Sequence, residues 1–121
     1  MKISPKTLLL VEDEIGIREH LTRFIERHSD FAVAPAKDGK EALAAFIQHK
    51  PQYVFLDLGL PDMSGLEILK KIKELDSTVK VYIMTGFDDH DMRQKAKELG
   101  ATAYLTKPIP LEDITAILKE A

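Results

Sequence analysis

Acidic, hydroxyl and ammonium side chains follow short apolar runs at four separate places in this sequence. Glu12 and Asp13 come directly after one run, and Asp57 comes after another. Thr85 and Lys107 follow two later runs. Carboxylates that are held close together repel one another, and burial disfavours their charged forms, so a cation must compensate them. Lys107 can supply one positive charge, and a divalent ion would supply two more.

The expected ion is Mg²⁺, or Mn²⁺ in its place, because oxygen ligands alone suit a hard cation. The chain has no cysteine and no histidine near these positions, so a zinc site is not expected. Glu12 and Asp13 are the better metal ligands. Asp57 can also bind the ion, and so can a backbone carbonyl just after it, that of Gly59.

Asp57 ends a central apolar run and is the best candidate for a nucleophile. A carboxylate can attack phosphorus and form an aspartyl phosphate. The three oxygens of that product need cations and hydrogen-bond donors, and the Lys107 ammonium and the Thr85 hydroxyl are of the right types. Gly86 leaves space for a tetrahedral group. The pattern therefore predicts phosphoryl transfer to Asp57.

Five short apolar runs alternate with five segments of helical periodicity, and this alternation would position the reactive side chains. Leu8–Val11 and Val54–Leu56 are apolar without alternation, which indicates strands buried on both faces, as in a parallel sheet. Strands that alternate with helices form an α/β fold whose ligands bind at the carboxyl ends of the strands. The predicted strands are Thr7–Val11, Phe31–Ala34, Tyr53–Leu56, Lys80–Met84 and Ala103–Leu105.

The helical segments carry apolar residues at spacings of three and four, which places them on one face of each helix. In the first helix, Ile17, Leu21, Phe24 and His28 share one face, and His28 is expected at the surface or at a helix end. The predicted inward residues of the other helices are Leu43, Phe46 and Ile47 in the second (about Gly39–Gln48), Leu66, Leu69 and Ile72 in the third, Met92, Ala96 and Leu99 in the fourth (about Asp89–Leu99), and Ile114, Ile117 and Leu118 in the fifth, from Leu111 onward. The other side of the first helix pairs Glu14 with Arg18 and Glu19 with Arg23.

Turn and capping residues predict where several elements begin or end. Pro35 lies just beyond the second predicted strand, and proline cannot donate to a ladder, so this strand belongs at an edge. Ser64 and Glu67 form a capping box at the third helix. Asp88 or Asp89 caps the fourth helix, and Gly100 stops it.

Composition narrows the class of protein. The 121 residues are 45% hydrophobic and 31% charged, which suits one domain spanning residues 1–121 with a core of about 7–120. Seventeen basic and twenty acidic residues give a net charge of −3, so direct nucleic-acid binding is not expected. No apolar run is long enough to cross a membrane. Met1–Pro5 offers no signal-peptide core, and we expect a cytoplasmic protein.

Four separated segments resemble the receiver domain of two-component response regulators, the CheY-like family. They are Leu10-Val11-Glu12-Asp13-Glu14, Phe55-Leu56-Asp57-Leu58-Gly59-Leu60-Pro61-Asp62-Met63-Ser64-Gly65, Met84-Thr85-Gly86 and Leu105-Thr106-Lys107-Pro108. The resemblance covers about Thr7 to Glu120. It implies a flavodoxin-like, doubly wound parallel sheet of five strands in the order 2-1-3-4-5, with five helices. That order places the second strand at an edge.

The resemblance also implies a role for each matching residue. Asp57 matches the phosphoacceptor, Asp13 a direct metal ligand, and Glu12 a ligand that acts largely through water. Gly59 matches the position whose carbonyl binds the metal. The switch residues Thr85 and Tyr104, the phosphate-contacting Lys107 and a cis bond before Pro108 complete the match.

A receiver domain accepts a phosphoryl group from the phosphohistidine of a sensor histidine kinase or a phosphotransfer protein, or from small donors such as acetyl phosphate. The resemblance therefore implies a signalling switch that acts on an output domain or a downstream effector. Its chemistry is self-phosphorylation and autodephosphorylation, without turnover of a separate substrate.

Three other functions fit parts of the pattern. A phosphatase of the haloacid dehalogenase type also uses an aspartate nucleophile and Mg²⁺, but it needs a second aspartate where this chain has Gly59. An FMN-binding flavodoxin needs a hydroxyl-rich loop where this chain has Glu12–Glu14, whose charges would repel the phosphate. A degenerate receiver that serves only as an interaction module would not need the complete acidic, Thr85 and Lys107 set.

Overall fold

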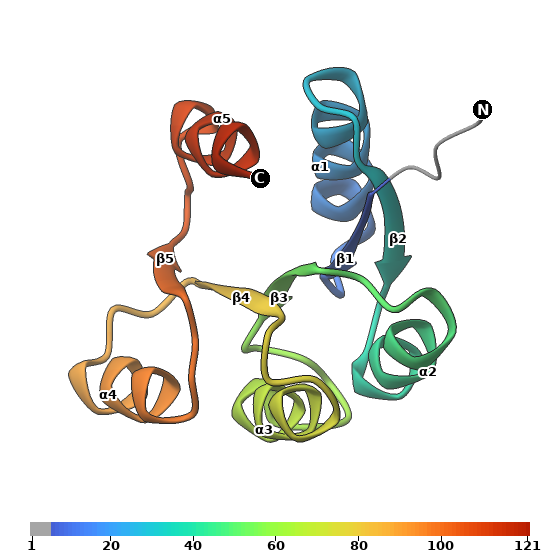
Figure 1. The fold of residues 1–121 in the computed structure, drawn as a ribbon. Helices are drawn as coiled ribbons and strands as arrows, with labels where there is room; N and C mark the ends of the chain where they lie inside the picture. Colours follow the sequence, from blue (N-terminus) through green and yellow to red (C-terminus); the bar gives the residue numbers. More distant parts are fainter. Residues whose placement is uncertain (1–5) are drawn as a thin grey trace.

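The computed structural model describes residues 6–121, so Met1–Pro5 and the expectations for that segment lie outside the described residues. The chain forms one parallel sheet of five strands in the order β2-β1-β3-β4-β5, with helices on both faces (Figure 1). The predicted α/β, flavodoxin-like architecture is confirmed. The elements are β1 (Thr7–Val11), α1 (Ile15–Arg27), β2 (Ala32–Ala36), α2 (Gly39–His49), β3 (Tyr53–Asp57), α3 (Gly65–Leu75), β4 (Lys80–Thr85), α4 (His90–Glu98), β5 (Ala103–Thr106) and α5 (Leu111–Glu120).

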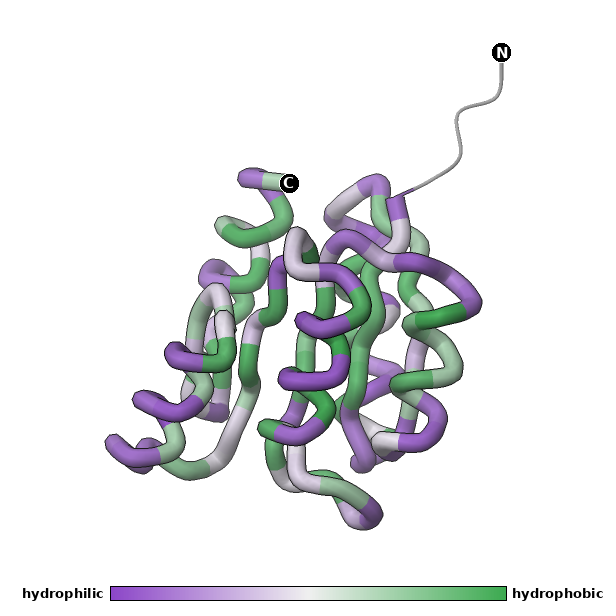
Figure 2. The backbone as a smooth tube through the Cα atoms, turned by 60° about the horizontal axis from the view of Figure 1, so that its bottom comes forward, coloured by the Kyte–Doolittle hydropathy of each residue, from purple (hydrophilic) through white to green (hydrophobic). Residues whose placement is uncertain are grey.

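Two hydrophobic cores cover the two faces of the sheet. Helices α1 and α5 lie on one face, and α2, α3 and α4 lie on the other (Figure 1). Within β1, Leu8 and Leu10 point to the first core, and Leu9 and Val11 point to the second. This is why the run is apolar without alternation: successive side chains point to opposite faces, and both faces are buried. Figure 2 shows the same arrangement, with hydrophobic residues along the strands and hydrophilic residues on the outer helix turns.

One predicted core position is wrong. Ile47 of α2 is 63% exposed, whereas Ala42 and Phe46 are buried. Ala42 and Phe46 are four residues apart and share a face, and Ile47 lies about 100° further around the helix. On α1, His28 is exposed at the C-cap, as expected for a residue at a helix end, and Leu21 and Ile25 reach the core.

The helix ends follow some of the predicted capping residues. Ser64 is the N-cap of α3 and accepts a hydrogen bond from the Leu66 amide at 3.2 Å. The predicted capping box is wrong, because the Glu67 side chain makes no return bond to the Ser64 amide. Asp89 caps α4, and Gly100 stands after α4 with a positive φ of 96°.

The edge strand β2 includes Pro35, which we had placed just beyond it. The Ala32 amide donates to β1, at the Lys6 carbonyl, so the amides of odd-numbered residues point away from the sheet. Proline is tolerated at an outward position because no ladder bond is lost there. The outward amides of Val33 and Lys37 donate to the side chains of Glu26 and Glu41. The edge therefore offers few free donors to another strand.

No helix within residues 6–121 is long and apolar enough to cross a membrane.

Candidate phosphoacceptor site

The site lies where the carboxyl ends of four strands meet. Asp57 is the last residue of β3 and Thr85 is the last residue of β4, so both strands run one residue beyond their predicted ends. Glu12 and Asp13 follow β1, and Lys107 follows β5. From β1 the chain continues to β2 on one side of the sheet, and from β3 it continues to β4 on the other side. In open α/β sheets, ligands usually bind at the point where the strand order reverses in this way.

Three carboxylates gather at this point. Glu12, Asp13 and Asp57 each offer an oxygen, and these oxygens all lie within 4.8 Å of one another. Glu12 is 1% exposed and Asp57 is 6% exposed, whereas Asp13 is open to solvent. The predicted acidic residues therefore come together, with one of them facing the side from which a ligand would arrive.

Lys107 bridges the two buried carboxylates. Its Nζ lies 2.7 Å from Glu12 Oε1 and 3.1 Å from Asp57 Oδ2. Its backbone amide donates to the Thr85 carbonyl at 2.7 Å, which holds the start of the β5–α5 loop against β4. The Lys107–Pro108 peptide bond is cis.

Burial and hydrogen bonding shift the pKa values of this pair. Burial raises the pKa of the Glu12 carboxyl above its usual value, against the opposing effect of the Lys107 hydrogen bond. Burial alone would lower the pKa of the Lys107 ammonium, but its hydrogen bonds to Glu12 and Asp57 outweigh that effect and raise it. Lys107 therefore carries its charge at neutral pH.

A backbone amide and one arginine side chain form further hydrogen bonds at Glu12 and Asp13. The Glu14 amide donates to Glu12 Oε2 at 3.2 Å. Arg18 donates to the backbone carbonyls of Glu12 and Asp13, at 2.8 and 3.2 Å. The predicted Glu14–Arg18 ion pair is wrong, because Arg18 turns toward the backbone that follows β1. Within residues 6–121, Glu19 and Arg23 do not form the predicted ion pair either. Sequence reasoning missed this role of Arg18, although its place one turn after the acidic pair was visible.

The donor set fits a hard divalent cation. Three carboxyl groups and one ammonium group gather here, so acidic groups outnumber the basic group that bridges them. All the available ligand atoms are oxygens, which Mg²⁺ prefers. The Gly59 amide donates to Asp57 Oδ1 at 3.0 Å, so the backbone just after Asp57 folds back toward the cluster. Glu12, Asp13 and Asp57 are the side chains that would hold such an ion.

Thr85 and Tyr104 are linked through Phe87, a connection that sequence reasoning missed. The buried Thr85 Oγ1 accepts a hydrogen bond from the Phe87 amide at 3.2 Å. The Tyr104 hydroxyl donates to the Phe87 carbonyl at 3.1 Å, and the Arg93 guanidinium lies 4.7 Å from the Tyr104 ring centroid. A Cβ at Gly86 would meet no atom within 4 Å, so the loop between Thr85 and Phe87 has open space beside it.

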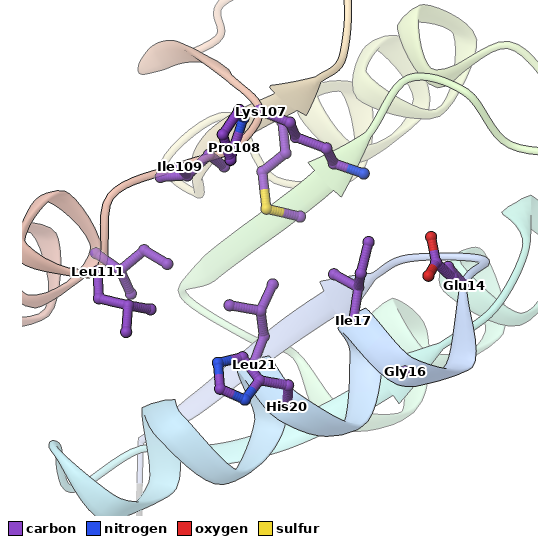
Figure 3. A pocket seen from close by; sticks show the side chains of 11 residues that line it. Glu14, Gly16, Ile17, His20, Leu21, Lys107, Pro108, Ile109 and Leu111 are labelled. Atoms are coloured by element: carbon purple, nitrogen blue, oxygen red, sulfur yellow. The ribbon is translucent and has the colours of Figure 1, made fainter.

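An apolar groove of about 650 Å³ opens beside Lys107, between α1 and the β5–α5 loop. Figure 3 shows Ile17, Leu21 and His20 from α1 facing Ile109 and Leu111 across this groove. Leu111 is 40% exposed. The groove therefore joins an accessible apolar surface to the edge of the acidic cluster.

Comparison with known proteins agrees with this fold. The response regulator receiver domain family matches residues 8–119, and the chain belongs to this family of two-component signalling domains. Sporulation initiation phosphotransferase F of Bacillus subtilis (strain 168) is 35% identical to it, over 93% of this chain and 90% of that protein. Other relatives are longer transcriptional regulatory proteins, of which the chain spans about half the length.

Solved structures share the same architecture. A CheY-like receiver domain protein from Methanospirillum hungatei JF-1 superposes with a TM-score of 0.91 at 29% identity, covering 97% of this chain and 93% of that one. A response regulator protein from Burkholderia pseudomallei, with a phosphorylated aspartic acid, a calcium ion and citrate, has a TM-score of 0.86 at 30% identity. That match covers 93% of this chain and 66% of the other.

Proposed function

We propose that this chain is a single receiver domain that accepts a phosphoryl group on Asp57 in a reaction that depends on Mg²⁺, with Mn²⁺ as a possible substitute. The observation that carries the proposal is the juxtaposition of Asp57, two further carboxylates and the Lys107 ammonium at the carboxyl ends of the strands. The phosphorylated aspartic acid and the calcium ion of the Burkholderia relative support it. When bound, Mg²⁺ would neutralise charge on the phosphoryl oxygens and orient them.

Asp57 acts as the nucleophile in this proposal. One of its carboxylate oxygens forms a bond to phosphorus, and the bond from phosphorus to the donor's histidine nitrogen breaks. The nitrogen leaves with the electron pair and takes up a proton. Glu12 and Asp13, which follow β1, and the Gly59 carbonyl, which follows β3, would hold the metal.

Lys107 and Thr85 serve the product. The Lys107 Nζ already lies 3.1 Å from Asp57 Oδ2 and would move its hydrogen bonds to a phosphoryl oxygen. The Thr85 hydroxyl would donate to another phosphoryl oxygen, and Gly86 would leave room for the group.

The same Thr85 movement carries the signal. In the described structure the Thr85 oxygen is occupied by the Phe87 amide, and Phe87 is held in turn by Tyr104. When Thr85 turns to the phosphoryl group, the bond to Phe87 is lost and Tyr104 is free to move inward. The face formed by α4, β5 and α5 is the two-state element that phosphorylation biases. An output domain or a downstream effector reads that face.

The phosphoryl donor in this proposal is a sensor histidine kinase or a phosphotransfer protein in the cytoplasm. Its apolar surface would cover the groove between α1 and the β5–α5 loop, which borders Lys107. This placement excludes water and brings the phosphohistidine beside Asp57. We propose no direct contact of this domain with nucleic acid or a membrane, and no turnover of a separate substrate, because Gly59 cannot act as a general acid.

Intact mass after incubation with acetyl phosphate tests the proposal. We expect one phosphoryl adduct that requires Mg²⁺, is absent in Asp57→Asn, and persists in the control Asp30→Asn, which changes an exposed aspartate away from the site. An undiminished adduct in Asp57→Asn would contradict the assignment of the nucleophile. Absence of both the adduct and Mg²⁺ binding in the wild-type protein would favour an interaction module.

A further inference from the structure

Asp62 fastens the loop that follows Asp57 to a neighbouring helix. The loop between β3 and α3 passes the amino terminus of α2, and there Asp62 Oδ1 accepts the Gly39 amide at 2.8 Å. Asp62 Oδ2 accepts the Lys40 amide at 3.0 Å. The side chain is exposed, yet both of its oxygens are engaged by residues 22 or more positions away in the chain. The Gly39 hydrogen bond is the main reason that the pKa of Asp62 is lowered.

Helix α2 has a cap of its own in Asp38, and Asp62 binds two further amides at the same end of the helix from a distant loop. Asp38 is the N-cap of α2, and its Oδ1 accepts the Glu41 amide at 2.8 Å. A helix amino terminus carries partial positive charge, and charge-assisted bonds to a carboxylate are the stronger kind. Because each Asp62 oxygen accepts a separate amide, the two bonds fix both the distance and the orientation of the loop relative to α2.

Packing closes the loop on both sides of Asp62. A Cβ on Gly39 would lie 2.6 Å from Met63 Sδ, so Met63 sits directly against the backbone of α2. A Cβ on Gly65 would lie 2.6 Å from Leu58 Cα, so the end of the loop folds onto its own beginning. Gly59 lies between these fixed points, and its amide donates to Asp57 Oδ1.

We infer that Asp62 is a positioning residue for the metal site: by clamping the β3–α3 loop to α2, it holds the Gly59 carbonyl in place as a ligand and so sets the affinity for Mg²⁺. The inference rests on the proposed function, in which the Gly59 carbonyl binds the ion. Groups behind the direct ligands commonly change metal affinity by about 10- to 100-fold. Asp62 does not contact the ion itself in this arrangement, since its oxygens are bound to α2.

The test compares Asp62→Ala with Asp38→Ala, using calorimetric titration of the metal-free protein with Mg²⁺. Both substitutions remove a carboxylate that accepts a hydrogen bond from an amide in the first turn of α2. Only Asp62→Ala also releases the β3–α3 loop. We expect Asp62→Ala to weaken Mg²⁺ binding about tenfold and Asp38→Ala to leave it within about twofold of wild type. Hydrogen exchange of the Gly59 amide should accelerate in Asp62→Ala alone.

Asp62→Asn keeps one acceptor oxygen and is expected to bind Mg²⁺ with intermediate affinity, which provides a second variant if Asp62→Ala folds poorly. Wild-type affinity in both Asp62 variants would overturn the inference. Equal losses in Asp62→Ala and Asp38→Ala would overturn it too, because helix stability alone would then explain the effect. Failure of the proposed function looks different: the wild-type protein itself would not bind Mg²⁺, and the inference would fall with it.

Discussion

The loop after β3 and the loop after β4 both border the phosphoacceptor site, and they are anchored by different means. The β3–α3 loop is held by the two hydrogen bonds of Asp62 and by close packing at Gly39 and Gly65. A side chain added at either glycine would overlap existing atoms. This loop has little room to move while α2 and α3 stay in place.

The β4–α4 loop has open space around it. A Cβ added at Gly86 would have no neighbouring atom within 4 Å, and Phe87 is 77% exposed. Two hydrogen bonds hold Phe87, one to Thr85 and one from Tyr104. Helix α4 that follows buries Ala96 alone among its nine residues.

The difference matches the two tasks that the proposed function assigns to these loops. A metal site needs ligands that keep their geometry, which rigid support provides. A switch needs a segment with few buried contacts, because such segments change conformation at low cost. Under the proposed function, the firmly anchored β3–α3 loop would support the ion, and the open β4–α4 loop would respond to the phosphoryl group.

The largest expected contrast comes from adding one methyl group to each loop. Gly65→Ala should lower the free energy of unfolding by about 1–3 kcal/mol, because its Cβ meets the Leu58 backbone. Gly86→Ala should change it by less than about 0.5 kcal/mol, because that position is open. Urea denaturation of the two variants measures both values. Similar losses in the two variants would contradict the contrast between the loops.

Mg²⁺ should stabilise the protein more at higher pH. Burial raises the pKa of Glu12 above its ordinary 4.5, so between the two values the folded protein binds more protons than the unfolded chain. The metal-free protein therefore loses stability as the pH rises through this window. Metal binding requires the deprotonated carboxylate, so the ion offsets a larger penalty above the window.

At one fixed Mg²⁺ concentration, a hundred times the Kd at pH 8, the gain is expected to be about 2.7 kcal/mol near pH 8 and smaller near pH 5, where Kd is larger. Lys107 keeps its charge throughout, since its pKa is raised above 10.5. Thermal unfolding with and without Mg²⁺ at the two pH values measures the gain. An equal or larger gain at the lower pH would contradict the assignment of Glu12 to the metal site.

The smallest expected effect concerns Tyr104. Tyr104→Phe removes the hydrogen bond to the Phe87 carbonyl and should cost about 0.5–1 kcal/mol or less, since the bond is exposed. Hydrogen exchange of the Phe87 amide should accelerate, because the loop loses one of its two ties. Tyr53→Phe, at the amino end of β3, is the matched control and should leave that exchange unchanged. Unaltered exchange in Tyr104→Phe would show that Tyr104 does not hold the loop.

The short-range sequence pattern predicted the strands and helices well, but it predicted less well which helix residues face the core. The alternation of apolar runs with helical periods predicted the parallel sheet, because buried parallel strands need apolar side chains on both faces. Ile47 looked like a core residue because it lies four residues after Leu43, at helical spacing, yet its side chain is exposed. The Ser64–Glu67 capping box failed because the spacing allows the bond without requiring it. Pro35 correctly predicted that β2 is an edge strand. The structure explains why Pro35 can lie within β2: its backbone nitrogen points away from the neighbouring strand.

The sequence by itself determined which groups would form the site. Glu12, Asp13, Asp57 and Lys107 follow strands that run parallel, and the carboxyl ends of parallel strands must meet at one edge of the sheet. Only the tertiary structure decided how the loops beside that site are held. The bonds from Asp62 to α2 and from Tyr104 to Phe87 join residues that are 17 or more positions apart. No local pattern encodes such contacts, because they depend on where helices and loops come to rest against the finished sheet.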